Sequence, residues 1–131
     1  MMNKNFINGV FVVAMLLFVG LACNQHGTML EFNGGELYYT KNVNEAETKK
    51  LGEYLVKEGF FDGVRKTVQL DKSGSTYQFR MVVQKEKQND DATAEVMKTF
   101  AKEVSSAVFS NAPVEMHICD ESLKTLKVVK P

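Results

Sequence analysis

Hydrophobic and polar positions change their period several times after residue 35, and each change predicts a new element. Residues 36–40 (ELYYT) are short and rich in aromatic side chains, which is typical of a strand. Asn44 and Glu47 have the spacing of a capping box, so a helix is expected to begin there. An apolar stripe gives this helix its buried side, with Leu51, Tyr54 and Leu55 as its members. Gly59 is placed to end it in a left-handed conformation.

The second half of the chain repeats this pattern. Residues 66–70 (KTVQL) and 76–84 (TYQFRMVVQ) alternate with period two, and Gly74 between them favours a hairpin. A second helix is predicted from apolar residues spaced three and four apart: Met97, Phe100, Ala101, Val104 and Val108. Residues 114–120 (VEMHICD) alternate again, and residues 123–129 (LKTLKVV) are expected to form a last short strand.

This order predicts an α+β fold built from two βαβ halves. It favours a ferredoxin-like split βαβ arrangement, βαββαβ plus an extra C-terminal strand. Right-handed crossovers would then place two helices on one face of an antiparallel sheet, with the first and third strands central. Another α+β layer with a meandering sheet is the alternative. Either fold makes residues 36–131 a single domain.

The beginning of the chain has the pattern of a secretory signal peptide. Lys4 precedes an apolar run over residues 10–22, which is too short for a typical membrane span of about 20 residues. The run ends in Gly20, Leu21, Ala22 and Cys23, which resembles the lipobox of bacterial lipoproteins. Gly20 stands where that family usually has leucine. The resemblance implies cleavage before Cys23 and a lipid anchor on that cysteine.

The resemblance to the lipobox predicts how the chain is divided and where the protein is located. Residues 1–22 become a signal peptide, and residues 23–35 a lipidated cysteine with a flexible tether. The protein is then expected in the cell envelope, attached to the membrane through Cys23. Asn24 is not the aspartate used for inner-membrane retention, which favours the outer membrane. The body is similar to small uncharacterised lipoproteins of Gram-negative bacteria, for which no activity is implied.

Charge and motifs exclude several classes of function. The chain has 16 basic and 16 acidic residues without a concentrated basic patch, so nucleic acid is not an expected partner. No motif for a cofactor, a paired-carboxylate site or a nucleophile elbow is present, so neither a cofactor nor an enzyme is expected. A hydrolase stays an alternative for which the sequence offers no catalytic constellation.

One strand carries the side chains with the richest chemistry. Glu115, His117 and Cys119 alternate along residues 114–120, so all three are expected on one side of the sheet. Imidazole and thiolate are good ligands for zinc or copper, which makes a metal-binding lipoprotein the first alternative. Successive side chains on one face lie about 7 Å apart, so further ligands would have to come from elsewhere.

The favoured hypothesis is a non-catalytic envelope lipoprotein. Its domain would bind an unknown protein or small ligand through the exposed face of its sheet. The strand phases place five candidate residues on that face: Tyr38, Gln69, Arg80, His117 and Cys119.

Overall fold

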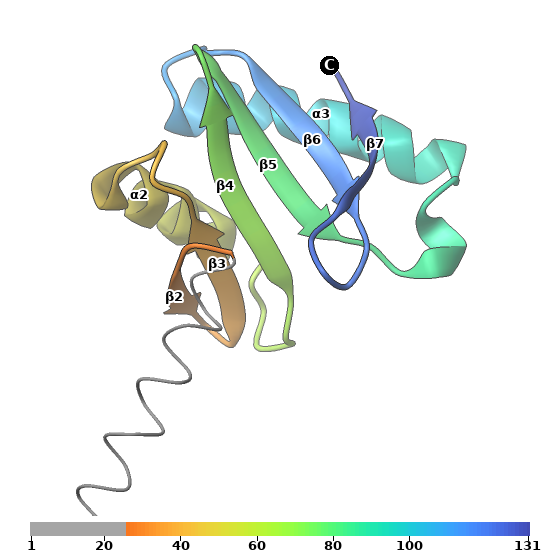
Figure 1. Ribbon diagram of the computed structural model, residues 1–131, viewed down its shortest axis with the longest axis horizontal. Helices are drawn as coiled ribbons and strands as arrows, with labels where there is room; N and C mark the ends of the chain where they lie inside the picture. The colour runs from red at the N-terminus through yellow and green to blue at the C-terminus, as the bar shows by residue number, and fades with distance from the viewer. Residues whose placement is uncertain (1–25) are drawn as a thin grey trace, which may run out of the picture.

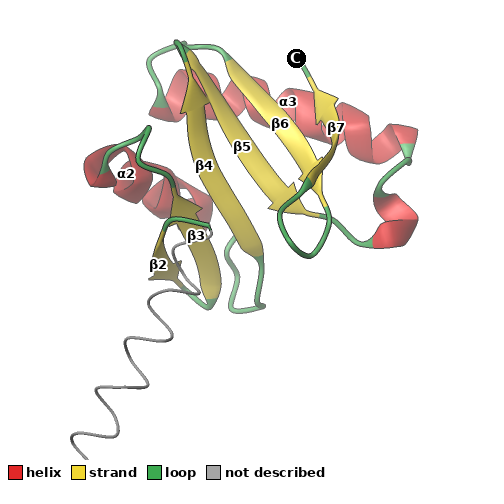
Figure 2. Ribbon diagram, viewed as in Figure 1, coloured by secondary structure: helices red, strands yellow, loops and turns green. Residues whose placement is uncertain are grey.

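The computed structural model describes residues 26–131 as a six-stranded sheet with two helices (Figures 1 and 2). In chain order the strands are β2 (Thr28–Phe32), β3 (Gly35–Tyr39), β4 (Thr67–Ser73), β5 (Thr76–Val82), β6 (Val114–Cys119) and β7 (Thr125–Val129). The helices are α2 (Glu45–Lys57) and α3 (Asp91–Val108), and a short 3-10 turn, η1, spans Lys85–Lys87. Neither helix of this described part is long and apolar enough to cross a membrane.

The sheet is mixed, and its strands lie in chain order, β2-β3-β4-β5-β6-β7. β3 pairs in parallel with β4, and β5 pairs in parallel with β6. The other three neighbouring pairs are antiparallel. The α+β class is therefore confirmed.

The ferredoxin-like strand order is not the one observed. A split βαβ unit has another strand between its two parallel strands, whereas here each helix connects two strands that are direct neighbours. The expected antiparallel sheet is mixed for the same reason. The central strands are β4 and β5, joined by the predicted hairpin around Gly74, which has φ of 61°.

The two helical crossovers differ in hand. β4 and β5 are antiparallel, so the two parallel pairs run in opposite directions while both crossovers step the same way along the sheet. If both crossovers had the same handedness, α2 and α3 would therefore lie on opposite faces of the sheet. Both helices instead bury residues in one hydrophobic cluster and contact each other, so they share a face. With the helices behind the sheet in Figure 1, β3-α2-β4 is the left-handed crossover, a rare arrangement.

The segment expected to be a tether contains a strand. Within residues 23–35, β2 pairs with β3 from Thr28↔Tyr39 to Phe32↔Gly35. Asn33 (φ 46°) and Gly34 (φ 85°) form the two-residue turn between them. Asn-Gly is the strongest short-range hairpin signal because both of its residues adopt positive φ readily. The folded domain therefore begins before residue 36.

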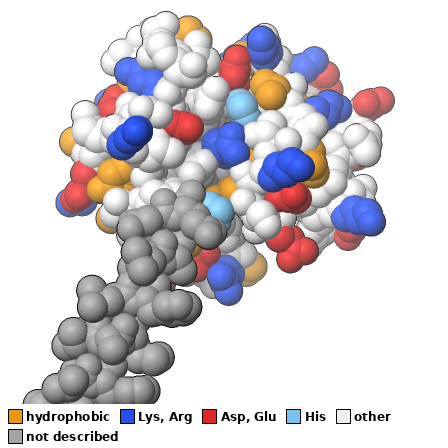
Figure 3. Space-filling model, in the orientation of Figure 1, with side chains coloured by type: hydrophobic (Ala, Val, Ile, Leu, Met, Phe, Trp, Pro, Cys, Tyr) orange, Lys and Arg blue, Asp and Glu red, His pale blue; other side chains and the backbone are white. Residues whose placement is uncertain are grey.

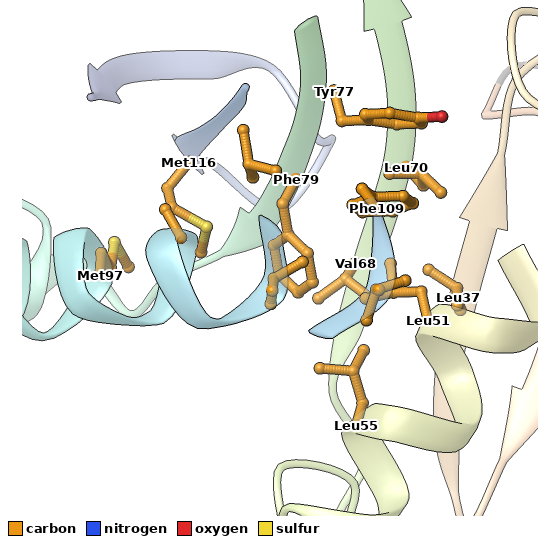
Figure 4. Close-up of a cluster of buried hydrophobic side chains, with 14 of the residues drawn as sticks. Leu37, Leu51, Leu55, Val68, Leu70, Tyr77, Phe79, Met97, Phe109 and Met116 are labelled. Atoms are coloured by element: carbon orange, nitrogen blue, oxygen red, sulfur yellow. The ribbon is translucent and has the colours of Figure 1, made fainter. Parts of the chain in front are cut away.

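Both helices begin at a capping residue and pack through an apolar stripe. The Asn44 side chain accepts from the Glu47 N–H, and the Glu47 carboxylate accepts from the Asn44 N–H, which completes the capping box. Asp90 caps α3 through the N–H of Thr93. Their stripes cover the apolar sheet face (Figure 4), where the largest fully buried side chains include Leu37, Leu51, Leu55, Phe79 and Met116.

Phe60 and Phe61, which follow α2, belong to the core. Gly59 has φ of 81° and the Phe60 N–H donates to Leu55 O, so the chain turns back after the helix. Phe61 is 1% exposed, and half-buried Phe60 stacks on Phe100 with ring centroids 5.8 Å apart. The two aromatic rings therefore stabilise the helix-sheet layer.

Candidate functional site

The site lies on the outer face, defined here as the sheet face opposite α2 and α3. The strand registers align a row of side chains directly across four strands, with Tyr38 beside Gln69, Gln69 beside Arg80, and Arg80 beside His117. Cys119 lies one step further along β6 on the same face, opposite Thr125 of β7. The five predicted residues thus share one face because period-two alternation holds in β3 to β6. Their predicted exposure is wrong for three of them, because Gln69, His117 and Cys119 are buried, while Tyr38 and Arg80 are half-buried.

The outer face carries charges of both signs, and no described helix lies on it (Figures 1 and 3). Glu31 is directly opposite Glu36 at the β2 end, and Glu36 forms an ion pair of 3.4 Å with Arg65. Glu115 forms a looser pair of 3.7 Å with Lys130 at the β7 end. This mixture differs from the single-signed surface of a nucleic-acid-binding protein.

Arg80 is the centre of the polar row. Its guanidinium donates from Nη1 to Thr125 Oγ1 over 2.7 Å and from Nη2 to the backbone oxygen of Leu123. These bonds reach across β6 and fix the turn that leads into β7. Arg80 Nε is buried without a described hydrogen-bond partner. Arg80 therefore positions a turn and an edge strand in addition to charging the face.

His117 is held on both sides. Its Nε2 lies 3.3 Å from Glu115 Oε1, and its Nδ1 lies 3.0 Å from Thr125 Oγ1. A carboxylate only accepts, so Nε2 carries the proton and Nδ1 accepts from the Thr125 hydroxyl. Burial lowers the pKa of His117 and the Arg80 charge adds to this, although Glu115 opposes them. The ring is therefore neutral and fixed in one tautomer at neutral pH.

Cys119 is a protonated, shielded thiol. It is fully buried, and its Sγ donates to the His117 backbone oxygen over 3.6 Å. Burial raises the pKa of this thiol. The thiolate is the nucleophile and the metal ligand, so a raised pKa disfavours both roles.

The geometry does not assemble the metal site considered as an alternative. Within residues 26–131, no group of three or more His, Cys, Asp or Glu side chains is arranged to hold a metal ion. Both nitrogens of His117 are engaged by Glu115 and Thr125. A metal would have to displace these partners and deprotonate Cys119.

A second polar cluster adjoins the row and was not found from the sequence. Asp71 Oδ1 accepts from Thr40 Oγ1 over 2.6 Å and from Asn42 Nδ2 over 3.0 Å. Burial acts to raise the pKa of Asp71, but these bonds outweigh it and hold the pKa below its ordinary value. The cluster fixes the loop between β3 and α2. In the sequence this cluster appears only as a Thr and an Asn that follow a strand, a pattern too common in loops to identify a site.

A small hollow opens beside this cluster. It is open to solvent, has a volume of about 420 Å³ and is lined by His26, Thr40, Val43 and Gln69, among others. Small-molecule pockets occupy roughly 300–1,000 Å³, so this hollow is at the lower end of that range.

The described chain starts against the outer face. The His26 backbone oxygen accepts from Gln69 Nε2 over 2.8 Å, and the His26 ring stands edge-on to Tyr38 at 5.5 Å. The predicted lipidation site, Cys23, and the signal peptide of residues 1–22 lie outside the described residues.

Comparison with known proteins places the domain in a family. A family model described as the AF_1994_N family N-terminal domain matches residues 29–131. No curated protein and no solved structure matches the chain. The match begins inside β2 and continues through β7, so it covers nearly the whole described sheet. The chain therefore belongs to the AF_1994_N family.

Proposed function

We propose that the protein is a cell-envelope lipoprotein, anchored through Cys23, whose domain binds a protein or small ligand through the outer face and has no catalytic role. The observation that carries the proposal is the row from Tyr38 to His117, which lies on the sheet face that no described helix covers. Hydrogen bonds to Thr125 and Glu115 fix Arg80 and His117 in place, while Arg80 Nε has no described partner. Gln69 and His117 are buried, so they support the face, and the half-buried Tyr38 and Arg80 are the members of the row that a partner would contact.

The composition of the outer face favours a protein partner. Tyr, Arg and Met are enriched at protein interfaces, and the row contains Tyr38 and Arg80 beside Met29. Met29 is directly opposite Tyr38 and is 37% exposed. The hollow beside Gln69 supports a small ligand as the second candidate.

A lipid on Cys23 would keep this face near the membrane. Two residues separate Cys23 from His26, so three Cα steps of 3.8 Å span at most about 11 Å. His26 is bonded to Gln69, so the lipid would hold that part of the outer face close to the bilayer surface. The partner is then a molecule at the same membrane, with the outer membrane favoured.

Lipidation is tested by replacing Cys23. Metabolic palmitate labelling of the wild-type chain should be lost in Cys23→Ser, and that variant should stay unprocessed or leave the membrane fraction. Unchanged labelling in the variant would refute the anchor.

Binding is tested by copurification from detergent-treated envelopes. Tyr38→Ala should remove specific copurified proteins that Lys102→Ala retains, because Lys102 is exposed on α3 in the opposite layer. Identical sets of proteins with both variants would argue against the outer face.

A further inference from the structure

β7 is an edge strand of the sheet and carries positive charge. In the sheet it pairs only with β6, so its other side offers unpaired backbone groups. Lys124, Lys127 and Lys130 occur within and beside it, whereas β2 at the other edge contains one charged residue, Glu31. Neither Lys124 nor Lys127 forms an ion pair with a described residue. The edge therefore has positive charge that the described domain leaves uncompensated.

The same edge exposes two apolar side chains. Leu126 is 49% exposed and Val128 is 41% exposed, and Lys127 lies between them. Val128 is opposite His117 on the outer face, and Lys127 is opposite Ile118 on the side that faces the helices. A register shift between Ile118 and Cys119 interrupts the alternation at Leu126. A strand added to this edge would place alternate side chains beside Lys127 and Val128.

β7 is also held in a fixed position. The Asp120 side chain accepts from the N–H groups of Ser122 and Lys124, and the Asp120 N–H donates to Lys124 O. Arg80 adds its bonds to Leu123 and Thr125. An edge that is already ordered costs less conformational entropy when a partner strand binds.

The charge of Lys127 determines which kind of strand can pair with β7. In an antiparallel pair of two copies over the full strand Thr125–Val129, the central Lys127 would lie opposite Lys127 of the other copy. Like charges directly opposite are destabilising, and edge lysines are a common protection against self-pairing. An opposite charge at that position is favourable instead.

We infer that the β7 edge binds an extended acidic peptide segment by strand addition. The segment has an acidic residue opposite Lys127 and an apolar residue beside Val128. The edge adjoins the His117 end of the row, but its unpaired backbone groups are on the side of β7 away from β6, so the inference does not depend on the partner of the outer face.

The test uses the full chain in detergent micelles and two blocked peptides, Thr-Val-Glu-Val-Thr and Thr-Val-Lys-Val-Thr. Titration of the glutamate peptide should shift the backbone amide NMR signals of residues 125–129 saturably, while the lysine peptide binds about tenfold more weakly. Raising salt to about 1 M, where the Debye length is about 3 Å, should reduce this preference.

Charge reversal separates recognition from general destabilisation. Lys127→Glu should weaken the glutamate peptide about tenfold and strengthen the lysine peptide, whereas Lys102→Glu on α3 changes neither. Equal binding of both peptides, no saturable shift, or preference unchanged in Lys127→Glu would overturn the inference. Concentration-dependent dimerisation through β7 would overturn it as well, because the occupant would then be a second copy. Neither outcome bears on lipidation or on copurification through Tyr38.

Discussion

Gly52→Ala should destabilise the domain although it improves a helix. Glycine inside a helix is about 1 kcal/mol less favourable than alanine, so this substitution normally stabilises. Gly52 is buried in α2, however, and a Cβ there would lie 2.3 Å from the ring of Phe32 in β2. The ring is confined because it stacks on Phe61 with centroids 6.3 Å apart.

The expected change in the free energy of unfolding is the sum of two opposing effects. Overpacking a filled site costs about 1–3 kcal/mol, and the helix gains about 1 kcal/mol. Gly52→Ala should therefore change the free energy of unfolding by roughly 0 to 2 kcal/mol in the destabilising direction. In a Phe32→Ala background the obstacle is gone, and the same substitution should stabilise by up to about 1 kcal/mol.

Denaturant unfolding followed by circular dichroism measures this double-mutant cycle in a chain that starts at residue 24. The expected coupling between positions 32 and 52 is about 1–3 kcal/mol. Lys49→Ala, an exposed position in α2, should change stability by less than about 0.5 kcal/mol. Gly52→Ala that stabilises equally in both backgrounds would show that β2 does not pack on α2.

Three further predictions concern the core and the polar row. Phe100→Ala should cost about 3 kcal/mol in denaturant unfolding, the lower end of the range for aromatic residues, because Phe100 packs on Phe60 and Phe79 but is only half-buried; a negligible change would mean that the phase of α3 is wrong. The pKa of His117 is lowered in the folded state, so the contribution of this group to the free energy of unfolding is fully present above pH 6.5 and falls as the pH drops below that value. His117→Gln should flatten this pH dependence of stability, and a pH profile unchanged by the substitution would contradict the prediction. In a chain that starts at residue 24, and so lacks Cys23, buried Cys119 should react with a disulfide reagent only after denaturant is added, and rapid labelling of the native protein would show that the thiol is accessible.

Periodicity predicts the elements of this chain well because the sheet has one buried and one polar face. The alternation of Tyr77, Phe79 and Met81 against Gln78 and Arg80 is the same in the sequence and in the structure. The helix caps at Asn44 and Asp90 follow from short-range chemistry that is visible in a few residues. The grouping of Arg80 and His117 on one face follows from the same alternation.

Strand order and long-range contacts are not contained in that local signal. A split βαβ and two neighbouring parallel pairs share the same element order, and both arrangements place the two helices on one face, so the order of elements does not select between them. β2 had a signal in Asn33-Gly34, but its short, mostly polar surroundings resemble a linker. The bonds from Arg80 to Leu123 and Thr125 depend on a turn more than forty positions away, which alternation does not encode.

The claim that the outer face is the binding surface is tested most directly by site-specific photocrosslinking in living cells. A photoreactive amino acid is placed at Gln78, on the outer face between Asp71 and Glu115, or at Val96, which is exposed on α3. We expect one discrete crosslinked product from Gln78 that is absent from Val96 and is lost when Tyr38→Ala is added. A product of the same size from Val96, or none from Gln78 in a chain shown to be lipidated, would contradict the claim.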